Sequence, residues 1–218
     1  MELRYRNGLP KQFKLKEAQF KLSKRHVLKI HYNNKNVMLT SNGIPSSGSG
    51  LASHLITRSD IGMLDAVTDV AHEIRHMFGL LHEHQDSMFW GTGISEPVFT
   101  FNCQDLKDHD EKTKGKTGEQ INGANGICES REEAAKAGFS AVEFLPLMGS
   151  TALAAGPEDV DWDSIMLYAS GAGGQASTQT RDRRAPALLK KKGNEETKPK
   201  TKPSAKDVQA LKNLYKIK

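Results

Sequence analysis

The stretch from Met63 to His82 reads MLDAVTDVAHEIRHMFGLLH, and its second half is His72-Glu73-Ile74-Arg75-His76-Met77-Phe78-Gly79-Leu80-Leu81-His82. Apolar residues recur along it at spacings of three and four, which predicts an amphipathic helix from Met63 to Phe78. The residues of this apolar stripe are Met63, Val67, Val70, Ile74, Met77 and Phe78. Gly79 follows where a residue in the left-handed conformation commonly ends a helix.

The same helix carries two histidines four residues apart. His72 and His76 project about 40° from each other, so both imidazoles can point at one ion, while the apolar stripe lies on the opposite side. Glu73 lies about 100° from His72, beside that ion. A turn at Gly79 lets the chain double back and brings His82 to the same place. This spacing predicts three histidine ligands with a carboxylate next to them.

Three imidazoles and an adjacent Glu favour a catalytic over a structural zinc site. Structural sites are closed by four protein ligands, often Cys, whereas three histidines leave one coordination position open. Zn²⁺ held in this way lowers the pKa of its bound water to about 7 and polarises a carbonyl. We therefore expect a zinc hydrolase in which Glu73 takes a proton from the zinc-bound water. Ordinary surface histidines would rarely show the complete pattern.

The string resembles the His-Glu-x-x-His-x-x-Gly-x-x-His signature of metzincin zinc metalloproteases, and its continuation His82-Glu83-His84-Gln85 is similar to the astacin-like family. Farther on, Asp163-Ser164-Ile165-Met166-Leu167-Tyr168 resembles the astacin Met-turn. The resemblance implies that Met166 packs beneath the zinc ligands. It also implies that Tyr168 is a catalytic residue and a switchable metal ligand, which leaves zinc to hydrogen-bond the oxyanion.

The resemblance also implies a fold. It is the α+β, metzincin-like fold, with a twisted mixed sheet and helices in an upper lobe and an irregular lower lobe that carries the Met-turn and a C-terminal helix. Residues 1–25 would be a basic N-terminal extension and 26–218 the catalytic domain, with an upper lobe of about 26–82 and a lower lobe of about 83–218. A protein or peptide substrate would add as an extended strand to an edge strand near Ser59 to Gly62. The protein would be a secreted monomer.

Departures from the family pattern stand out, and two of them, Arg75 and the altered residues after Gln85, favour an alternative together with the absence of a secretory signal. Arg75 replaces a small uncharged residue and, about 60° from His72, would crowd or repel a cation. The arginine that follows the motif in many astacins is absent after Gln85. Glu83, which in mature astacins pairs with a new N-terminus, would need a basic side chain or water instead. The alternative is therefore a catalytically impaired zinc-binding homologue that acts as a binding protein.

Other elements are predicted from local patterns. Alternation predicts a strand at Val27–Tyr32 with a hairpin partner at Val37–Leu39, a short edge strand within Leu51–Ile61 and a strand at Pro97–Phe101. Lys107–Gly126 reads as a charged loop, and 171–203 as an irregular or mobile basic segment. Ser130 would cap a helix to Ala137.

The end of the chain predicts one more helix. It starts at Ser204, where Asp207 completes a capping pattern. Its apolar face would consist of Val208, Leu211, Leu214 and Tyr215. The two cysteines, Cys103 and Cys128, either form a disulfide or remain buried thiols.

Composition narrows the class of protein. The 218 residues are 37% hydrophobic and 26% charged, enough for one sizeable domain. The net charge of +5 comes mainly from the two ends, and the run Lys190-Lys191-Lys192 has no aromatic residue near it, which disfavours nucleic acid. No segment has the roughly 20 apolar residues of a membrane span, and Met1 to Arg6 does not read as a secretory signal.

Overall fold

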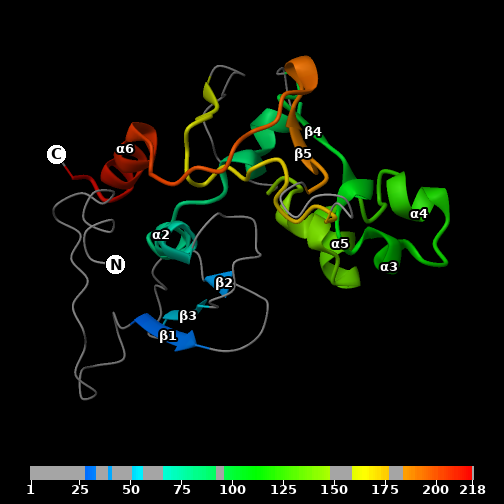
Figure 1. Cartoon of the computed structure of the whole chain (residues 1–218), viewed down its shortest axis with the longest axis horizontal. Coiled ribbons are helices and arrows are strands. Elements are labelled where there is room, and N and C mark those ends of the chain that lie inside the picture. The colour runs from blue at the N-terminus through cyan, green and yellow to red at the C-terminus, as the bar shows by residue number, and fades with distance from the viewer. Residues whose placement is uncertain are drawn as a thin grey trace. The chain divides into compact units, whose positions relative to one another are not determined.

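The computed structural model describes residues 28–32, 39–40, 51–55, 66–91, 96–147, 159–176 and 184–217 (Figure 1). The chain divides into two compact units. The first comprises residues 1–81, 163–166 and 199–218, and the second comprises residues 82–162 and 167–198. The described part of the chain contains both helices and small sheets, which confirms the predicted α+β class. The lobe boundaries expected from the sequence, and the expected mobility of 171–203, stay predictions.

The first unit contains a three-stranded mixed sheet (Figure 1). Strand β1 (Leu28–Tyr32) pairs in parallel with β3 (Leu51–Leu55), and β2 (Leu39–Thr40) pairs with β3 in the antiparallel sense. The predicted β1–β2 hairpin is therefore wrong, because β3 lies between these strands and uses both of its edges. β3 is central rather than an edge strand. The edge strand expected near Ser59 to Gly62 lies outside the described residues.

Helix α2 (Ala66–Met77) confirms the helix predicted from the apolar periodicity. It ends as expected at Gly79, whose φ is +97°. Gly79 N–H donates to His76 O at 2.8 Å and Leu80 N–H donates to Arg75 O at 3.0 Å, the two bonds of a Schellman motif. Only glycine adopts this backbone conformation at low cost. The helix therefore ends at Met77, and the chain turns at Gly79, three residues after His76.

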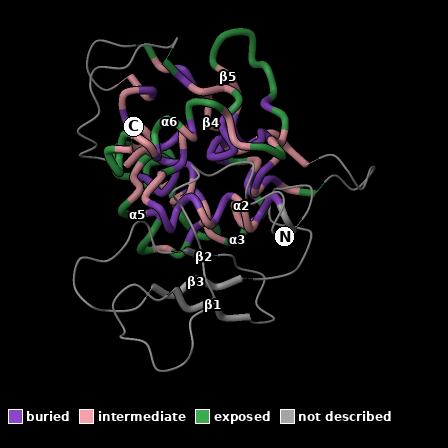
Figure 2. Tube along the Cα trace, turned by 90° about the vertical axis from the view of Figure 1, so that its left-hand side faces the viewer, coloured by how far each residue is buried: buried purple, intermediate pink, exposed green. Residues whose placement is uncertain are grey.

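The last residues of the apolar stripe, Met77 and Phe78, pack on the C-terminal helix α6 (Ala205–Leu214). Met77, Phe78 and Leu211 form a buried cluster, and Figure 2 shows the buried residues along α2 in purple. The Tyr215 hydroxyl donates to Phe78 O at 3.1 Å. Of the predicted apolar face of α6, Leu211 is fully buried whereas Leu214 is 55% exposed, because the helix ends there.

The start of α6 follows the sequence pattern. Ser204 Oγ accepts from Asp207 N–H at 2.9 Å, and Asp207 Oδ2 accepts from Ser204 N–H at 2.9 Å. This reciprocal pair is the predicted capping box, since each side chain satisfies a backbone donor that the first turn leaves without a helical acceptor. The cap also fixes where the Asp207 carboxylate lies.

The second unit has its own hydrophobic core, which includes Leu106, Phe139, Phe144 and Leu188. Strand β4 (Phe99–Phe101) pairs with β5 (Leu188–Lys190) in the antiparallel sense. The prediction of a strand near Phe99 is confirmed. The segment expected to be irregular contains β5, because the fully buried Leu188 belongs to the core.

Short helices fill the rest of the second unit. They are η1 (Glu83–Gln85), η2 (Ser87–Trp90), η3 (Cys103–Asp105), α3 (His109–Thr113), α4 (Gly118–Asn122), α5 (Arg131–Ala137), η4 (Ser140–Glu143) and η6 (Lys192–Asn194). The predicted loop from Lys107 to Gly126 thus contains two helices, of which α4 starts at a Thr117–Gln120 capping box. Ser130 caps α5 as predicted, with its Oγ accepting from Glu133 N–H at 3.3 Å.

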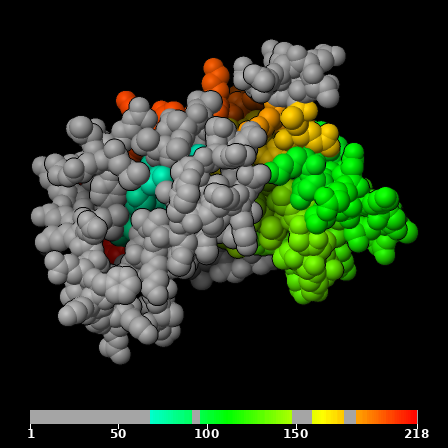
Figure 3. Space-filling view, turned by 60° about the horizontal axis from the view of Figure 1, so that its bottom comes forward, coloured from blue at the N-terminus to red at the C-terminus, as the bar shows by residue number. Residues whose placement is uncertain are grey.

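Cys103 and Cys128 form a disulfide in the second unit, which decides between the two alternatives left by the sequence. Figure 3 shows residues of α3, α4 and α5, in green to yellow-green, exposed on the surface of this unit. Among the described helices, none is long and apolar enough to span a membrane.

Candidate metal centre

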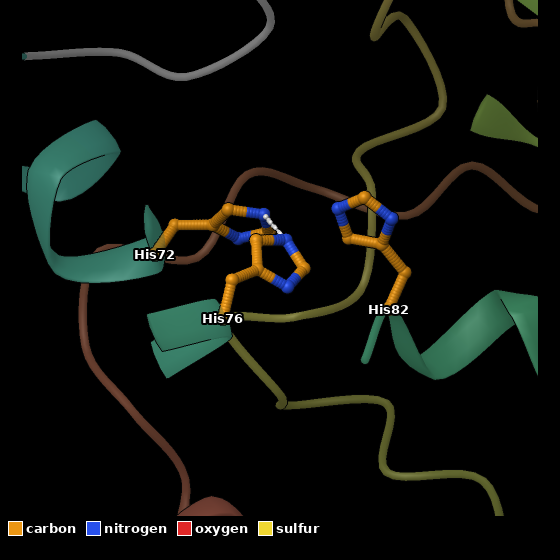
Figure 4. A group of neighbouring side chains, drawn as sticks. All are labelled: His72, His76 and His82. Carbon is orange, nitrogen blue, oxygen red and sulfur yellow. Dashed lines mark hydrogen bonds between the residues drawn. The ribbon is translucent and has the colours of Figure 1, made fainter. Parts of the chain in front are cut away.

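Three histidines of the signature lie together in the structure (Figure 4). His72 and His76 come from consecutive turns of α2, and His82 follows the Gly79 turn. Each offers one ring nitrogen, and these nitrogens all lie within 4.8 Å of one another. The three side chains are buried, with exposed fractions of 4%, 7% and 8%. Three convergent imidazoles could therefore hold one metal ion, as the spacing predicts.

The hydrogen bonds of the three Nδ1 atoms decide the tautomers. His72 Nδ1 lies 2.8 Å from Ile165 O, His76 Nδ1 lies 2.8 Å from Leu80 O, and His82 Nδ1 lies 2.9 Å from Gln85 Oε1. Carbonyl and amide oxygens only accept hydrogen bonds, so each Nδ1 carries the proton and donates it. In the neutral rings each Nε2 then carries a lone pair, which is the form that binds a metal.

The contact between His72 Nε2 and His76 Nε2 tests the fit to zinc. The two atoms are 3.1 Å apart, and zinc–nitrogen bonds of about 2.0–2.1 Å at a tetrahedral angle would place two ligand nitrogens about 3.4 Å apart. The contact can be a hydrogen bond only if one ring becomes an imidazolium. Burial opposes this, because desolvation lowers the pKa of His76, although the bond to Leu80 O partly offsets the effect. The residues therefore fit a divalent cation.

Glu73 directly follows His72 on α2 and is 9% exposed. A side chain at this position of the helix lies about 100° from His72, next to the ligand nitrogens rather than behind them. A carboxylate is the proton acceptor that a hydrolytic site needs. The position of the Glu73 carboxylate beside the ligand nitrogens, and its role as a base, stay predictions.

The turn from Ser164 to Met166, called the Met166 turn below, is hydrogen-bonded to the first turn of α6 within the first unit. Ser164 Oγ donates to Asp207 Oδ1 at 2.6 Å, and Ile165 N–H donates to Asp207 Oδ2 at 3.0 Å. Met166 N–H donates to Ser164 Oγ at 2.9 Å, and Met166 is only 1% exposed. Since Ile165 O is the acceptor for His72, the Asp207 carboxylate helps to position this candidate metal ligand through the turn.

Tyr168 belongs to the second unit, where it lies beside His82. The centroids of the two rings are 4.4 Å apart, and the Tyr168 ring is 4.6 Å from that of His84. Thr197 Oγ1 donates to Tyr168 O at 2.9 Å, and this bond holds the backbone of Tyr168 in place. The structure therefore brings Tyr168 to the third histidine of the motif, and its role as a metal ligand stays a prediction.

Gln85 is a site residue whose role the sequence did not reveal. It is 4% exposed, and while its Oε1 accepts from His82, its Nε2 donates to Glu143 O at 3.0 Å and to Val142 O at 3.3 Å. His84 Nε2 donates to the same Glu143 O at 2.9 Å. Gln85 thus connects His82 to the backbone of Glu143, which lies 58 residues from Gln85. A polar residue three positions after His82 was the only signal in the sequence.

Arg75 and Glu83 have partners that the sequence did not predict. Arg75 is only 3% exposed, and its Nη1 donates to Ala71 O at 2.6 Å. Burial lowers the pKa of Arg75, and the negative charge of Asp207 opposes this shift. Arg75 is therefore buried against the helix backbone and interacts electrostatically with the carboxylate that holds the Met166 turn. Glu83 Oε1 accepts from Asp161 N–H at 2.8 Å, a backbone partner that the sequence did not predict.

Comparisons with known proteins add a likeness in shape. No protein-family model matches the chain, and no curated protein sequence matches it. Among solved structures, the chain is similar to high choriolytic enzyme 1, a hatching enzyme zinc-protease from the medaka fish Oryzias latipes. The two are 14% identical, with a TM-score of 0.49, and the match covers 87% of this chain and 69% of that chain. At this level of similarity, conclusions about activity rest on the site itself.

Proposed function

We propose that this chain is a zinc-dependent metalloendopeptidase of the metzincin kind, within the astacin-like branch. The observation that carries the proposal is the arrangement of His72, His76 and His82, whose ring nitrogens converge within 4.8 Å. Each Nδ1 donates to an oxygen, so three Nε2 lone pairs are available for one zinc ion. A site with three histidines and no sulfur ligand is typical of hydrolytic zinc.

The residues of the chain then divide the work of peptide hydrolysis. Bound zinc would supply a Lewis acid that lowers the pKa of a coordinated water and polarises the scissile carbonyl. Glu73 accepts the proton of the attacking water and delivers it to the nitrogen of the leaving amine, so that the carboxylate is regenerated. The Tyr168 hydroxyl donates a hydrogen bond to the oxyanion. Met166 provides an apolar support below the histidines.

We further propose that the substrate is a protein or peptide bound as an extended strand, and that the enzyme acts as a monomer. An extended substrate would pair its backbone with an edge strand near Ser59 to Gly62, which lies outside the described residues. The mixed pairing of β1, β2 and β3 supports a metzincin-like sheet in the first unit. Neither nucleic acid nor a membrane is proposed as a partner.

The test combines metal content with cleavage by the purified full chain. We expect one zinc per chain by elemental analysis, and casein cleavage that a chelator stops and added zinc restores. Glu73→Gln is the matched control, because it keeps the shape and the histidines but removes the base, and we expect it to bind zinc and lose about 10²–10⁴-fold in kcat. Wild-type protein that carries one zinc and cleaves no faster than Glu73→Gln would contradict the proposal.

A second candidate is a zinc-binding homologue that does not cleave. The observation that favours this second candidate is the buried guanidinium of Arg75 on α2, the helix of His72 and His76. A positive charge on this helix disfavours the binding of a cation nearby. Arg75→Gly distinguishes the two candidates. Cleavage that appears only in Arg75→Gly supports the impaired homologue, whereas cleavage by the wild-type chain rules it out.

A further inference from the structure

A second group of metal-binding side chains lies in the second unit, apart from the zinc motif in the sequence. Cys103, His109 and Cys128 each offer one ligand atom, and these atoms all lie within 4.8 Å of one another. The two cysteines are 6% and 2% exposed and form the disulfide, with their Cα atoms 5.7 Å apart. The His109 side chain is 19% exposed, so solvent reaches one side of the group.

Short local turns hold the three residues together. Cys103 begins η3, and Leu106 N–H donates to Cys103 O at 3.1 Å while His109 N–H donates to Leu106 O at 3.0 Å. These bonds fold the chain back, so that α3 begins with His109 near Cys103. Cys128 is fixed separately by a bond from its N–H to Ile121 O at 2.9 Å. The placement of the group therefore comes from backbone bonds as well as from the disulfide.

The tautomer of His109 suits metal binding. Its Nδ1 lies 3.1 Å from Asp110 Oδ1, so in the neutral ring Nδ1 carries the proton and donates it to the carboxylate. Nε2 then carries the lone pair. A carboxylate that accepts from the far nitrogen of a histidine orients the ring toward the metal.

The oxidation state of the cysteines decides whether the group can bind a metal. A disulfide offers no thiolate, and the thiolate is the form that binds metal ions. A dithiol reductant transfers two electrons and two protons, so that the sulfur–sulfur bond breaks into two thiols and the reductant becomes a disulfide. A divalent cation then displaces one proton from each thiol and leaves two metal–sulfur bonds.

The distances allow this exchange without refolding. Zinc–sulfur bonds of about 2.3 Å and zinc–nitrogen bonds of about 2.0–2.1 Å would place the two sulfurs about 3.8 Å apart and each sulfur about 3.6 Å from the ligand nitrogen. The two sulfur atoms and the His109 nitrogen already lie within 4.8 Å of one another, so only small movements would bring them to these separations. The sulfurs would move apart by less than about 2 Å from their bonded distance.

We propose that Cys103, Cys128 and His109 form a second divalent metal site that opens when the disulfide is reduced. The oxidised chain holds residues 103 and 128 together by a covalent bond, and the reduced chain holds them together through the metal. With two thiolates and one imidazole, the site selects a thiophilic ion such as Zn²⁺ over Mg²⁺ or Ca²⁺. The proposal is independent of the proposed peptidase activity, since the three-histidine site contains no sulfur.

Cobalt(II) titration of the full chain tests it, because sulfur–cobalt bonds give a charge-transfer absorption that a three-histidine site cannot produce. We expect no such band from the oxidised protein. After reduction by a phosphine, we expect the band to rise with one further equivalent of cobalt and to disappear when zinc is added. A reduced chain that shows two titratable thiols and native circular dichroism, but no band, overturns the proposal.

Three variants locate the ligands. Cys103→Ser with Cys128→Ser should show no band in either state, and Asp110→Ala should weaken cobalt binding in the reduced chain by about 10-fold. His109→Ala should weaken it more than Asp110→Ala, and an unchanged affinity overturns the assignment of His109. If reduction alone lowers the native circular dichroism, recovery on adding zinc supports the proposal, and failure to recover overturns it.

Discussion

The first unit holds two of the candidate metal ligands, His72 and His76, through backbone oxygens, whereas the second unit holds His82 through a side chain. His72 donates to Ile165 O and His76 donates to Leu80 O. His82 donates instead to Oε1 of Gln85. No substitution removes a backbone carbonyl, so the first pair can be disturbed only by moving the backbone. The orientation of His82 depends on one replaceable residue.

The groups that hold the histidine acceptors in place also differ between the units. In the first unit the Ile165 carbonyl is held by the buried carboxylate of Asp207, which accepts from Ser164 Oγ, Ile165 N–H and Ser204 N–H. In the second unit Gln85 is held by neutral carbonyl groups around Glu143. A buried carboxylate with several donors is costly to remove, and an amide with carbonyl partners is less so. We therefore expect variants of the two supports to fail in different ways.

Asp207→Ala should have the largest effect. It leaves buried donors of the Ser164 turn without an acceptor and removes the charge opposite Arg75, so we expect the free energy of unfolding to fall by about 3 kcal/mol. Denaturant titration of the zinc-free protein measures this. Asp163→Ala is the control, because the Asp163 side chain is 85% exposed and its ion pair with Lys200 should contribute less than about 1 kcal/mol. Equal losses in the two variants would refute the role of Asp207.

Gln85→Ala should weaken zinc binding by about 10- to 100-fold, because His82 loses the acceptor that fixes its tautomer and orientation. Competition with a chromogenic chelator measures the affinity. Gln85→Glu keeps an acceptor for His82 but loses the donor to Glu143 O, so it should retain zinc affinity better than Gln85→Ala while losing stability. Gln104→Ala, an exposed position, controls for the loss of a glutamine. Unchanged zinc affinity in Gln85→Ala would show that His82 needs no such support.

Arg75→Ala should lower the free energy of unfolding by about 1–2 kcal/mol, because the variant loses the bond to Ala71 O and the attraction to Asp207. If Arg75 acts mainly on Asp207, the losses in Arg75→Ala and Asp207→Ala will not be additive, and a double-mutant cycle measures this coupling. Additive losses would mean that Arg75 and Asp207 stabilise the first unit independently.

Among these variants, Glu143→Gln should change the free energy of unfolding least, and the change should depend on pH. Burial raises the pKa of Glu143, and Arg131 partly opposes this. The folded state thus binds the proton more tightly than the unfolded state, so this contribution to stability is fully present below the ordinary pKa of 4.5 and is lost as pH rises through the folded pKa. Glu143→Gln should therefore gain stability relative to wild type between pH 4 and 7, the range to be covered by denaturant titration. The same gain in Glu111→Gln, whose side chain is 77% exposed, would contradict this cause.

Local patterns predicted the parts of the molecule that depend on neighbours in the sequence. The periodicity and Gly79 predicted where α2 ends, and Ser130 and Ser204 predicted the starts of α5 and α6. Capping bonds and helix faces join residues at most four or five positions apart, so a single sequence contains them. The strand at Leu28–Tyr32 was predicted for the same reason, but its partner was not.

The order of the strands in the sheet could not be predicted from the sequence. β1 ends at Tyr32 and β2 begins at Leu39, a spacing that favours a hairpin, yet β3 pairs with both. Hydrogen bonding between strands depends on which backbones meet in space, and alternation of side chains does not encode the partner. The pairing of Cys103 with Cys128 was undecided for a similar reason, since it depends on folding across 25 positions.

The sequence by itself identified the candidate metal ligands and the candidate base, because three histidines and a glutamate recur at the required spacing within one short stretch. Only the tertiary structure decided how those ligands are held. Ile165 is 93 positions from His72, and Glu143 is 58 positions from Gln85. Bonds across such distances form only when the chain is folded. The burial of Arg75 near Asp207 was decided in the same way, because it depends on α6 packing against α2.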